Sequence, residues 1–178
     1  MTDCLSRKAC GGAAAGKQAI LLNGPSSSGK STLAKALQAL IEARRGEKYE
    51  VVSIDDFMKI SLMETIYEDD VFDISGDLCT GALEILKTGT GVIIDHVITS
   101  ERIFRQLKEA LRDYPLRPVH VTCAPEVLRE RERARGDRCP GSAEASAEYL
   151  YPKEGYELTV DTGTGSVTAN ALAVLAIL

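Results

Sequence analysis

Two kinds of hydrophobic pattern alternate along this chain. Short apolar runs bounded by polar residues are typical of buried strands, and longer segments with apolar residues every three or four positions predict amphipathic helices. The predicted strands span residues 18–23, 50–54, 91–96, 119–123 and 156–160. This alternation predicts an α/β fold in three layers, in which helices cover both faces of a parallel sheet.

The clearest predicted helix follows the first strand, where Leu33, Leu37, Leu40 and Ile41 would form one apolar stripe. The same spacing recurs in residues 78–86 and again in residues 103–111. Two further helices are expected, one from Pro125 to a break at Gly136 and one after the glycine-rich turn at residues 163–165.

The length of 178 residues and the 44% hydrophobic content fit one globular domain. We expect residues 1–17 to form a flexible tail and residues 18–178 to form the domain. The leader holds no apolar stretch of signal-peptide length, and the apolar run at residues 171–178 is far below the roughly 20 residues needed to cross a bilayer. The sequence therefore predicts a cytoplasmic protein without a membrane partner, and it leaves the oligomeric state open.

Charge and cysteine content disfavour some classes of function. Against 26 acidic residues the chain has 21 Lys and Arg, a net charge of -5, so no overall positive field would attract nucleic acid. The cysteines are scattered, without zinc-ligand spacing, and are interpreted as reduced thiols. They are Cys4, Cys10, Cys79, Cys123 and Cys139.

A phosphate-binding loop is the strongest chemical signal. The pattern GxxxxGK[ST] stands directly after an apolar strand and directly before an amphipathic helix. In such a loop the backbone N–H groups and the helix N-terminus face the β- and γ-phosphates of a nucleotide. The predicted ATP-binding residues here are Gly24, Pro25, Ser26, Ser27, Ser28, Gly29, Lys30, Ser31 and Thr32. Lys30 would add a charge, and the Ser31 hydroxyl would bind Mg²⁺.

Two alternatives bear on this loop. Residues 11–18 also fit GxxxxGK, but that copy ends in Gln18 and has no strand before it, so it is discarded. The other alternative is a turn rich in Gly and Ser that only connects a strand to a helix, which the full motif in context disfavours.

Acidic residues follow two predicted strands, at the sheet edge where ligands bind in parallel α/β folds. Asp55 could accept the proton of an acceptor hydroxyl or orient it for attack on the γ-phosphate. Asp95 ends an apolar run in the manner of a Walker B strand and would orient the Mg²⁺ water shell. Asp56 is interpreted as a helix cap. His96 and His120 are interpreted as neutral structural side chains.

An arginine-rich helix follows the fourth strand. Arg131 and Arg135 are four residues apart and share one face, while Arg129 and Arg133 share the opposite one, so only one pair can face the phosphates. Past Gly136, Arg138 could swing over the nucleotide as part of a lid around residues 126–141. The alternative is a solvated helix whose arginines are neutralised by Glu126, Glu130 and Glu132.

Taken together, these segments resemble the chloramphenicol phosphotransferase family of P-loop kinases. The resemblance rests on LNGPSSSGKST, IDD, IIDHV, RExxARGDR and EGYELTVDT, and it spans about residues 18–176. It implies a five-stranded parallel sheet in the order 2-3-1-4-5, and ATP-dependent phosphorylation of an antibiotic's primary hydroxyl. It also implies that Asp55 is the base, Lys30 the loop lysine, and Arg131, Arg135 and Arg138 the lid arginines.

The predicted function is therefore an ATP- and Mg²⁺-dependent kinase of a small hydroxylated molecule, with Asp55, Lys30 and Arg135 as catalytic residues. Residues 58–74, where the acceptor pocket is expected, depart from the family pattern, so chloramphenicol and other antibiotic-like alcohols both stay open. One alternative is a metabolite kinase similar to shikimate or gluconate kinases. Another is a nucleotide-binding regulator or nucleic-acid-processing protein, which the acidic charge balance disfavours.

Overall fold

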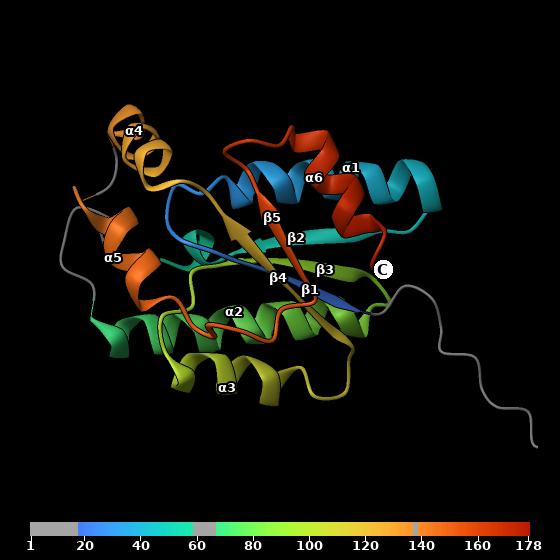
Figure 1. Ribbon diagram of the computed structural model, residues 1–178. Coiled ribbons are helices and arrows are strands. Elements are labelled where there is room, and N and C mark those ends of the chain that lie inside the picture. Colours follow the sequence, from blue (N-terminus) through green and yellow to red (C-terminus); the bar gives the residue numbers. More distant parts are fainter. Residues whose placement is uncertain (1–17, 59–66, 137–138) are drawn as a thin grey trace, which may run out of the picture.

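The computed structural model describes residues 18–58, 67–136 and 139–178 (Figure 1). The strands are β1 (Ala19–Asn23), β2 (Tyr49–Ser53), β3 (Gly91–His96), β4 (Leu116–Thr122) and β5 (Leu158–Asp161). The helices are α1 (Lys30–Arg45), α2 (Glu68–Lys87), α3 (Glu101–Ala110), α4 (Pro125–Arg135), α5 (Ser142–Tyr149) and α6 (Val167–Leu175), with a short 3₁₀ helix η1 (Ile54–Phe57) after β2.

The five strands form one parallel sheet in the order β2-β3-β1-β4-β5, which confirms the predicted fold and strand order. The inner strands β1 and β3 are buried along their whole length, because helices cover the sheet on both faces. In register, Asn23 at the end of β1 lies beside His96, and Ser53 at the end of β2 lies beside Asp95. The ends of three strands therefore meet at one edge of the sheet.

Helices form the outer layers, with α1 and α6 on one face of the sheet and α2 and α3 on the other (Figure 1). Successive residues of β1 point to opposite faces. Leu21 packs in the cluster with Leu78 of α2, whereas Leu22 packs with Leu33 and Leu37 of α1. The apolar spacing that predicted the helices thus marks the faces they bury.

Helices α4 and α5 lie outside these layers, beyond the carboxyl ends of the strands (Figure 1). A small separate cluster joins them, in which Leu128 of α4 packs near Ala143 of α5. Because this cluster is small, the α4–α5 pair depends on polar contacts as well as on apolar burial.

The fourth strand and helix α5 differ most from the prediction. The fourth strand begins at Leu116 and runs through Pro118; its pairing with β5 begins only at Val119, and the Pro118 carbonyl still accepts the Glu157 N–H. The missing proline N–H thus falls at the end of that ladder, where it costs little. Helix α5 was not predicted, because the small residues of this segment give only a weak apolar face.

Cys79 and Cys123 are buried free thiols and Cys139 is an exposed one, which agrees with the prediction for these three cysteines. Cys4 and Cys10 lie outside the described residues. No helix in the described part of the chain has both the length and the apolar character needed to cross a membrane.

Candidate active site

The predicted phosphate loop connects β1 to α1, and two of its residues have positive φ. Ser27 has φ 62° and Gly29, which precedes the helix, has φ 88°. Ser27 is therefore one of the few non-glycine positions with positive φ, a conformation that is uncommon and that gathers at ligand sites. Positive-φ residues in such a loop gather backbone N–H groups into a concave anion site at the N-terminus of α1.

The loop lies directly against β4. A Cβ added at Gly24 would lie 2.1 Å from the Val121 carbonyl oxygen, which belongs to the backbone of the neighbouring strand. Only a residue without a side chain fits there, so the first glycine of the motif is explained by contact with the sheet.

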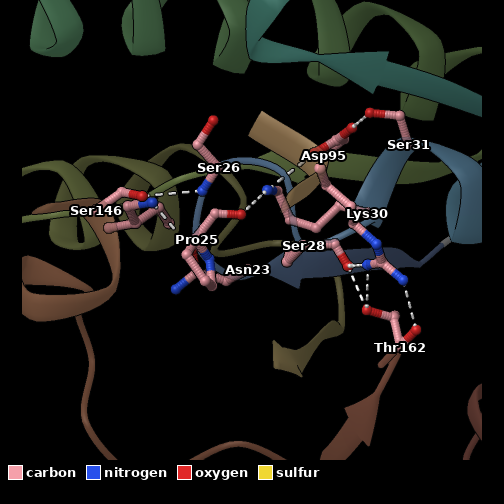
Figure 2. Close-up of polar contacts among 11 residues, drawn as sticks. Asn23, Pro25, Ser26, Ser28, Lys30, Ser31, Asp95, Ser146 and Thr162 are labelled. Carbon is pink, nitrogen blue, oxygen red and sulfur yellow. Dashed lines mark hydrogen bonds and ion pairs between the residues drawn. The ribbon is translucent and has the colours of Figure 1, made fainter. Parts of the chain in front are cut away.

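Lys30 and Ser31 begin α1 and face the end of β3 (Figure 2). The Lys30 ammonium group is buried, donates a hydrogen bond of 2.9 Å to the Pro25 carbonyl, and lies 4.0 Å from Asp95 Oδ1. The Ser31 hydroxyl donates to Asp95 Oδ2 at 2.5 Å. The side chains predicted for phosphate and for metal are thus brought together at one point.

The phosphate loop is also held from the α5 side. The Ser26 N–H donates to Ser146 Oγ of α5 at 2.9 Å (Figure 2). Asn23, which is completely buried just before the loop, donates to the Tyr151 carbonyl and to the Tyr156 hydroxyl, each at 2.8 Å. Both contacts connect the loop to the chain segment that follows α4.

A third support comes from the end of β5. Thr162 Oγ1 donates a hydrogen bond to the Ser28 carbonyl. Arg131 of α4 donates through Nη1 to the same carbonyl at 3.3 Å and through Nη2 to the Thr162 carbonyl at 2.8 Å. The guanidinium group of Arg131 therefore lies against the phosphate loop.

The arginine helix faces the cleft with the predicted pair. Arg131 and Arg135 both line it, whereas Arg129 turns to the carboxylates of Glu126 and Glu144. The neutralised-helix alternative therefore describes Arg129. Arg138 lies outside the described residues.

Glu132, one of the acids that could neutralise these arginines, has another role. Its buried carboxylate accepts the N–H groups of Gly141 at 2.9 Å and Ala143 at 2.7 Å, and the Ser142 hydroxyl at 2.8 Å. Burial on its own would raise the pKa of Glu132, but these hydrogen bonds together lower the pKa below its ordinary value. Glu132 thus caps α5 from α4 and joins the two helices.

Asp55 lies in η1, directly after β2, where its side chain is exposed and lines the cleft. The neighbouring Asp56 carboxylate accepts the Ser53 N–H at 3.4 Å and completes a capping box at the start of η1, so its interpretation as a cap is confirmed. Adjacent acids thus have different surroundings, and only Asp55 faces the cleft.

The two histidines have structural surroundings. His96 is buried, its Nε2 lies 2.8 Å from Ser75 Oγ, and burial lowers its pKa from 6.5 to about 4. The half-buried ring of His120 stacks on Tyr156 at 5.0 Å, and burial lowers the pKa of His120 as well. Both imidazoles are therefore neutral at pH 7, as the sequence predicted.

One cleft of about 1180 Å³ is lined by Lys30, Ser31, Asp55, Asp95, Arg131, Arg135, Ser146 and Thr162. The phosphate loop and α4 form one part of its wall. Apolar residues, among them Val71 and Ile74 of α2 and Val97 after β3, form another part of the wall. The cleft is thus large enough for a nucleotide and a second small molecule.

The site fits the β- and γ-phosphates of ATP with Mg²⁺. The loop offers two residues with positive φ and a buried lysine, and the buried hydroxyls of Ser27 and Ser28 have no hydrogen-bond partner among the described residues. No cluster of three or more His, Cys, Asp or Glu side chains in the described ranges could hold a metal without help. Mg²⁺ suits such a site, because it keeps several waters and binds through phosphates and one or two protein oxygens.

A family model described as chloramphenicol phosphotransferase-like protein matches residues 17–178. The chain belongs to this family. It is accordingly a P-loop kinase, an enzyme that transfers a phosphoryl group. No curated protein matches the sequence.

Solved structures similar to this family member include two kinases and an antibiotic resistance protein. The Mycobacterium tuberculosis APS kinase in complex with AMPPNP and APS has 16% identity and a TM-score of 0.71, covering 90% of this chain and 96% of that chain. The gluconokinase from Sinorhizobium meliloti 1021 has 22% identity and a TM-score of 0.68, with coverages of 90% and 93%. The Deinococcus radiodurans tunicamycin resistance protein has 17% identity and a TM-score of 0.64, with coverages of 90% and 95%. At these identities the likeness shows the shared fold.

The sequence alone did not indicate three residues that hold the phosphate loop in place. Asn23, Ser146 and Thr162 carry ordinary polar side chains to which the motifs assign no chemistry, although Asn23 stands within LNGPSSSGKST. Thr162 stands within the segment EGYELTVDT, which resembles the family, so its position gave one signal. Ser146 lies in a helix that was not predicted and gave none.

Proposed function

We propose that this enzyme transfers the γ-phosphoryl group of ATP, with Mg²⁺, to a hydroxyl of a small molecule, either chloramphenicol or another antibiotic-like alcohol. The observation that carries the proposal is the single cleft shared by the phosphate loop, the Ser31–Asp95 pair and Asp55. ATP would supply the phosphoryl group, and the residues of this chain would hold it, neutralise its charge and direct the acceptor.

The phosphate loop would bind the nucleotide. Its N–H groups and the N-terminus of the 16-residue helix α1 offer partial positive charge. Lys30 would add its ammonium group, and Arg131 and Arg135 would contact the phosphates from α4. The loop residues with this proposed role are Gly24, Pro25, Ser26, Ser27, Ser28, Gly29, Lys30, Ser31 and Thr32.

The metal would lie beside Ser31 and Asp95. The Ser31 hydroxyl is a direct ligand in this proposal, and Asp95 orients the water shell. Their hydrogen bond of 2.5 Å supports this arrangement, because a carboxylate that holds the hydroxyl proton turns the Ser31 lone pairs outward.

Asp55 would act on the acceptor. Its carboxylate lines the cleft at the end of β2 and would accept the hydroxyl proton or orient the oxygen for in-line attack. General-base assistance contributes about 10² to 10⁴ in rate, so the loss of Asp55 should affect turnover far more than ATP binding.

Residues 126–141 would form a lid that brings Arg135 to the transferring group, with Arg138 as an additional nucleotide contact. Residues 18–178 would form the kinase domain, and the protein would act in the cytoplasm. The tail expected at residues 1–17 lies outside the described residues. Hydrogen bonds of Arg131, Glu132 and Ser146 link α4 and α5 to the phosphate loop. These links support the proposal that the lid changes position when the loop binds a nucleotide.

The acceptor would have an apolar body. The wall of the cleft includes Val71, Ile74 and Val97, which would contact carbon-rich groups rather than a polyol. This favours an antibiotic-like alcohol over a sugar acid such as the one that the name of the Sinorhizobium gluconokinase implies. The tunicamycin resistance protein among the similar structures adds a reason to include antibiotics in a screen.

The test is an assay of ADP formation with a panel of alcohols at fixed Mg²⁺ and ATP. The panel contains chloramphenicol, other hydroxylated antibiotics, sugar acids and oligonucleotides, and mass spectrometry checks for one added phosphoryl group. We expect turnover with an apolar alcohol and none that depends on oligonucleotides. Turnover that responds only to oligonucleotides would favour the nucleic-acid-processing alternative, and turnover only with sugar acids the metabolite kinase.

Matched variants connect the activity to the site. Lys30→Ala should abolish turnover, whereas Lys35→Ala, at an exposed position of the same helix, should not change it. Asp55→Asn should lower kcat by about 10² or more, and Asp56→Asn, which keeps the oxygen that caps η1, should retain activity. If turnover stays at the wild-type level in both Lys30→Ala and Asp55→Asn, the proposed roles are wrong.

A further inference from the structure

Three groups from distant parts of the chain meet beside the phosphate loop. Figure 2 labels two of these residues, Ser28 and Thr162. They are the Ser28 carbonyl of the loop, the Thr162 hydroxyl that follows β5, and the Arg131 guanidinium group of α4. Thr162 Oγ1 donates to the Ser28 carbonyl, and Arg131 Nη1 reaches that carbonyl at 3.3 Å and the Thr162 hydroxyl at 3.2 Å. Thr162 therefore contacts both the loop and the arginine.

A threonine hydroxyl has one proton to donate and two lone pairs to accept. Donation to the Ser28 carbonyl uses the proton, with the Thr122 carbonyl as a second acceptor at 3.3 Å, and Arg131 then donates to a lone pair. The backbone holds Thr162 in place, because its N–H donates to the Thr122 carbonyl at 3.0 Å. The Asp161 carboxylate accepts the Gly163 N–H at 2.7 Å and so fixes the turn that follows. The hydroxyl thus projects from a rigid position.

The peptide unit between Ser28 and Gly29 connects the Ser28 carbonyl on one side of the loop to the Gly29 N–H on the other. In a trans peptide unit the C=O and the next N–H point in opposite directions because the unit is planar. When Thr162 and Arg131 hold the Ser28 carbonyl behind the loop, the Gly29 N–H points the opposite way, toward the concave side. Gly29 has φ 88°, and a Cβ there would lie 3.6 Å from Thr162 Oγ1, so the two residues are packed together.

We propose that Thr162 is a positioning residue that orients the Gly29 N–H toward the phosphates by holding the Ser28 carbonyl. This inference rests on the proposed nucleotide-binding function of the loop. It adds a residue from the end of β5, separated from Ser28 by 134 positions, to the apparatus that binds the anion.

The substitution Thr162→Val removes the hydroxyl and keeps the shape, and Thr162→Ser keeps the hydroxyl. Thr164→Val is the matched control, because Thr164 is exposed on the same turn and donates to Asp161 at 3.0 Å. Calorimetry would measure the affinity of each protein for inorganic tripolyphosphate and for AMPPNP at fixed Mg²⁺. Tripolyphosphate reports on phosphate contacts without a nucleoside.

We expect Thr162→Val to weaken binding of both ligands by roughly tenfold, in line with the loss of one hydrogen bond near a charged ligand. Thr162→Ser should restore binding to within about twofold of wild type, and Thr164→Val should match wild type. Unchanged tripolyphosphate affinity in a folded Thr162→Val protein would overturn the proposal. Wild-type protein that binds neither ligand would instead refute the proposed function.

A double-variant cycle separates action on the loop from action through the arginine. If Thr162 holds the Ser28 carbonyl directly, Thr162→Val should still weaken tripolyphosphate binding in an Arg131→Ala background. If Thr162 only positions Arg131, the substitution should have no effect there, and the proposal is wrong. Should Thr162→Val fail to fold, the wild-type protein decides: its Gly29 amide resonance should shift when tripolyphosphate is added, and an unresponsive amide would overturn the proposal.

Discussion

Ser31 donates a hydrogen bond of 2.5 Å to Asp95 Oδ2 and so ties the first turn of α1 to the end of β3. The neighbouring Lys30 lies 4.0 Å from the other oxygen of the same carboxylate. One buried acid thus contacts a hydroxyl and an ammonium group at the two ends of its carboxylate. Substitution of Asp95 should therefore affect both groups.

Asp95→Asn should raise the Mg²⁺ concentration that gives half-maximal turnover by about 10-fold to 100-fold, the usual cost of losing a group that orients a metal ligand. Ser31→Ala should act in the same direction. A titration of activity against Mg²⁺ at saturating ATP measures both. Asp113→Asn, at an exposed position, is the control, and an Asp95→Asn enzyme with the wild-type Mg²⁺ requirement would contradict the metal assignment.

Gly24→Ala should destabilise the protein strongly, because the added Cβ would lie 2.1 Å from the Val121 carbonyl and neither backbone can move away without opening the sheet. We expect a loss of about 3 kcal/mol or more, which corresponds to a fall in Tm of roughly 6–12 °C for a domain of this size. Differential scanning calorimetry measures it.

The matched control for this glycine is Gly76→Ala in α2. Its Cβ would meet only the flexible amide end of Gln106, at 3.2 Å, and alanine favours a helix by up to about 1 kcal/mol. Gly76→Ala should therefore leave Tm nearly unchanged or raise it slightly. Equal falls in Tm for both variants would show that space beside the sheet is not the cause.

The stability of the protein should fall between pH 6.5 and pH 4 because of His96. Burial lowers its pKa from 6.5 to about 4, so in this window the unfolded chain binds a proton that the folded protein excludes. Stability therefore decreases as the pH falls, by up to about 3 kcal/mol from this group. Urea unfolding at pH 7 and pH 5 measures the change.

His96→Gln should be less stable than wild type at pH 7, because its polar group is fully buried beside Ser75, but its stability should change less between the two pH values. His120→Gln serves as the comparison, since the ring of His120 is only half-buried and should contribute a smaller part of the slope. If the two variants retain the same pH dependence as wild type, His96 does not titrate as described.

Glu132→Gln should loosen α5. The amide keeps one oxygen but turns its NH₂ group toward backbone donors that the carboxylate accepted, at a cost of about 1–3 kcal/mol. We expect faster amide hydrogen exchange at Ala143 and along α5, with the rest of the sheet unchanged. Glu130→Gln, an exposed position on α4, should exchange as wild type does.

The same carboxylate predicts acid sensitivity. Because the pKa of Glu132 is lowered in the folded protein, its contribution to stability is present above the ordinary pKa and is lost as the pH falls through the folded pKa. Exchange at α5 in the wild-type protein should therefore accelerate below about pH 4.5. In Glu132→Gln the exchange should already be fast and should lack this acceleration.

Much of the fold could be predicted because its signals are local. The helical stripe of Leu33, Leu37 and Ile41 shows which face of α1 is buried. The apolar run before Asp95 likewise marks a buried strand, and neither signal requires knowledge of the packing partner. The phosphate loop is likewise contained in consecutive residues, so its position and its flanking strand and helix follow from the pattern. The helix α5 gave no such signal, because its small residues bury only Ala143 and depend on a cap from Glu132.

The amino-acid sequence alone, then, predicted a P-loop kinase with Asp55, Asp95 and an arginine helix near one edge of the sheet. Which groups hold the phosphate loop in shape was decided only by the folded structure. Arg131 and Thr162 meet the Ser28 carbonyl from 103 and 134 positions away, and Ser146 meets Ser26 from 120 positions away. Periodicity and motifs report interactions between near neighbours in sequence, whereas these hydrogen bonds exist only once the sheet has brought distant strand ends together.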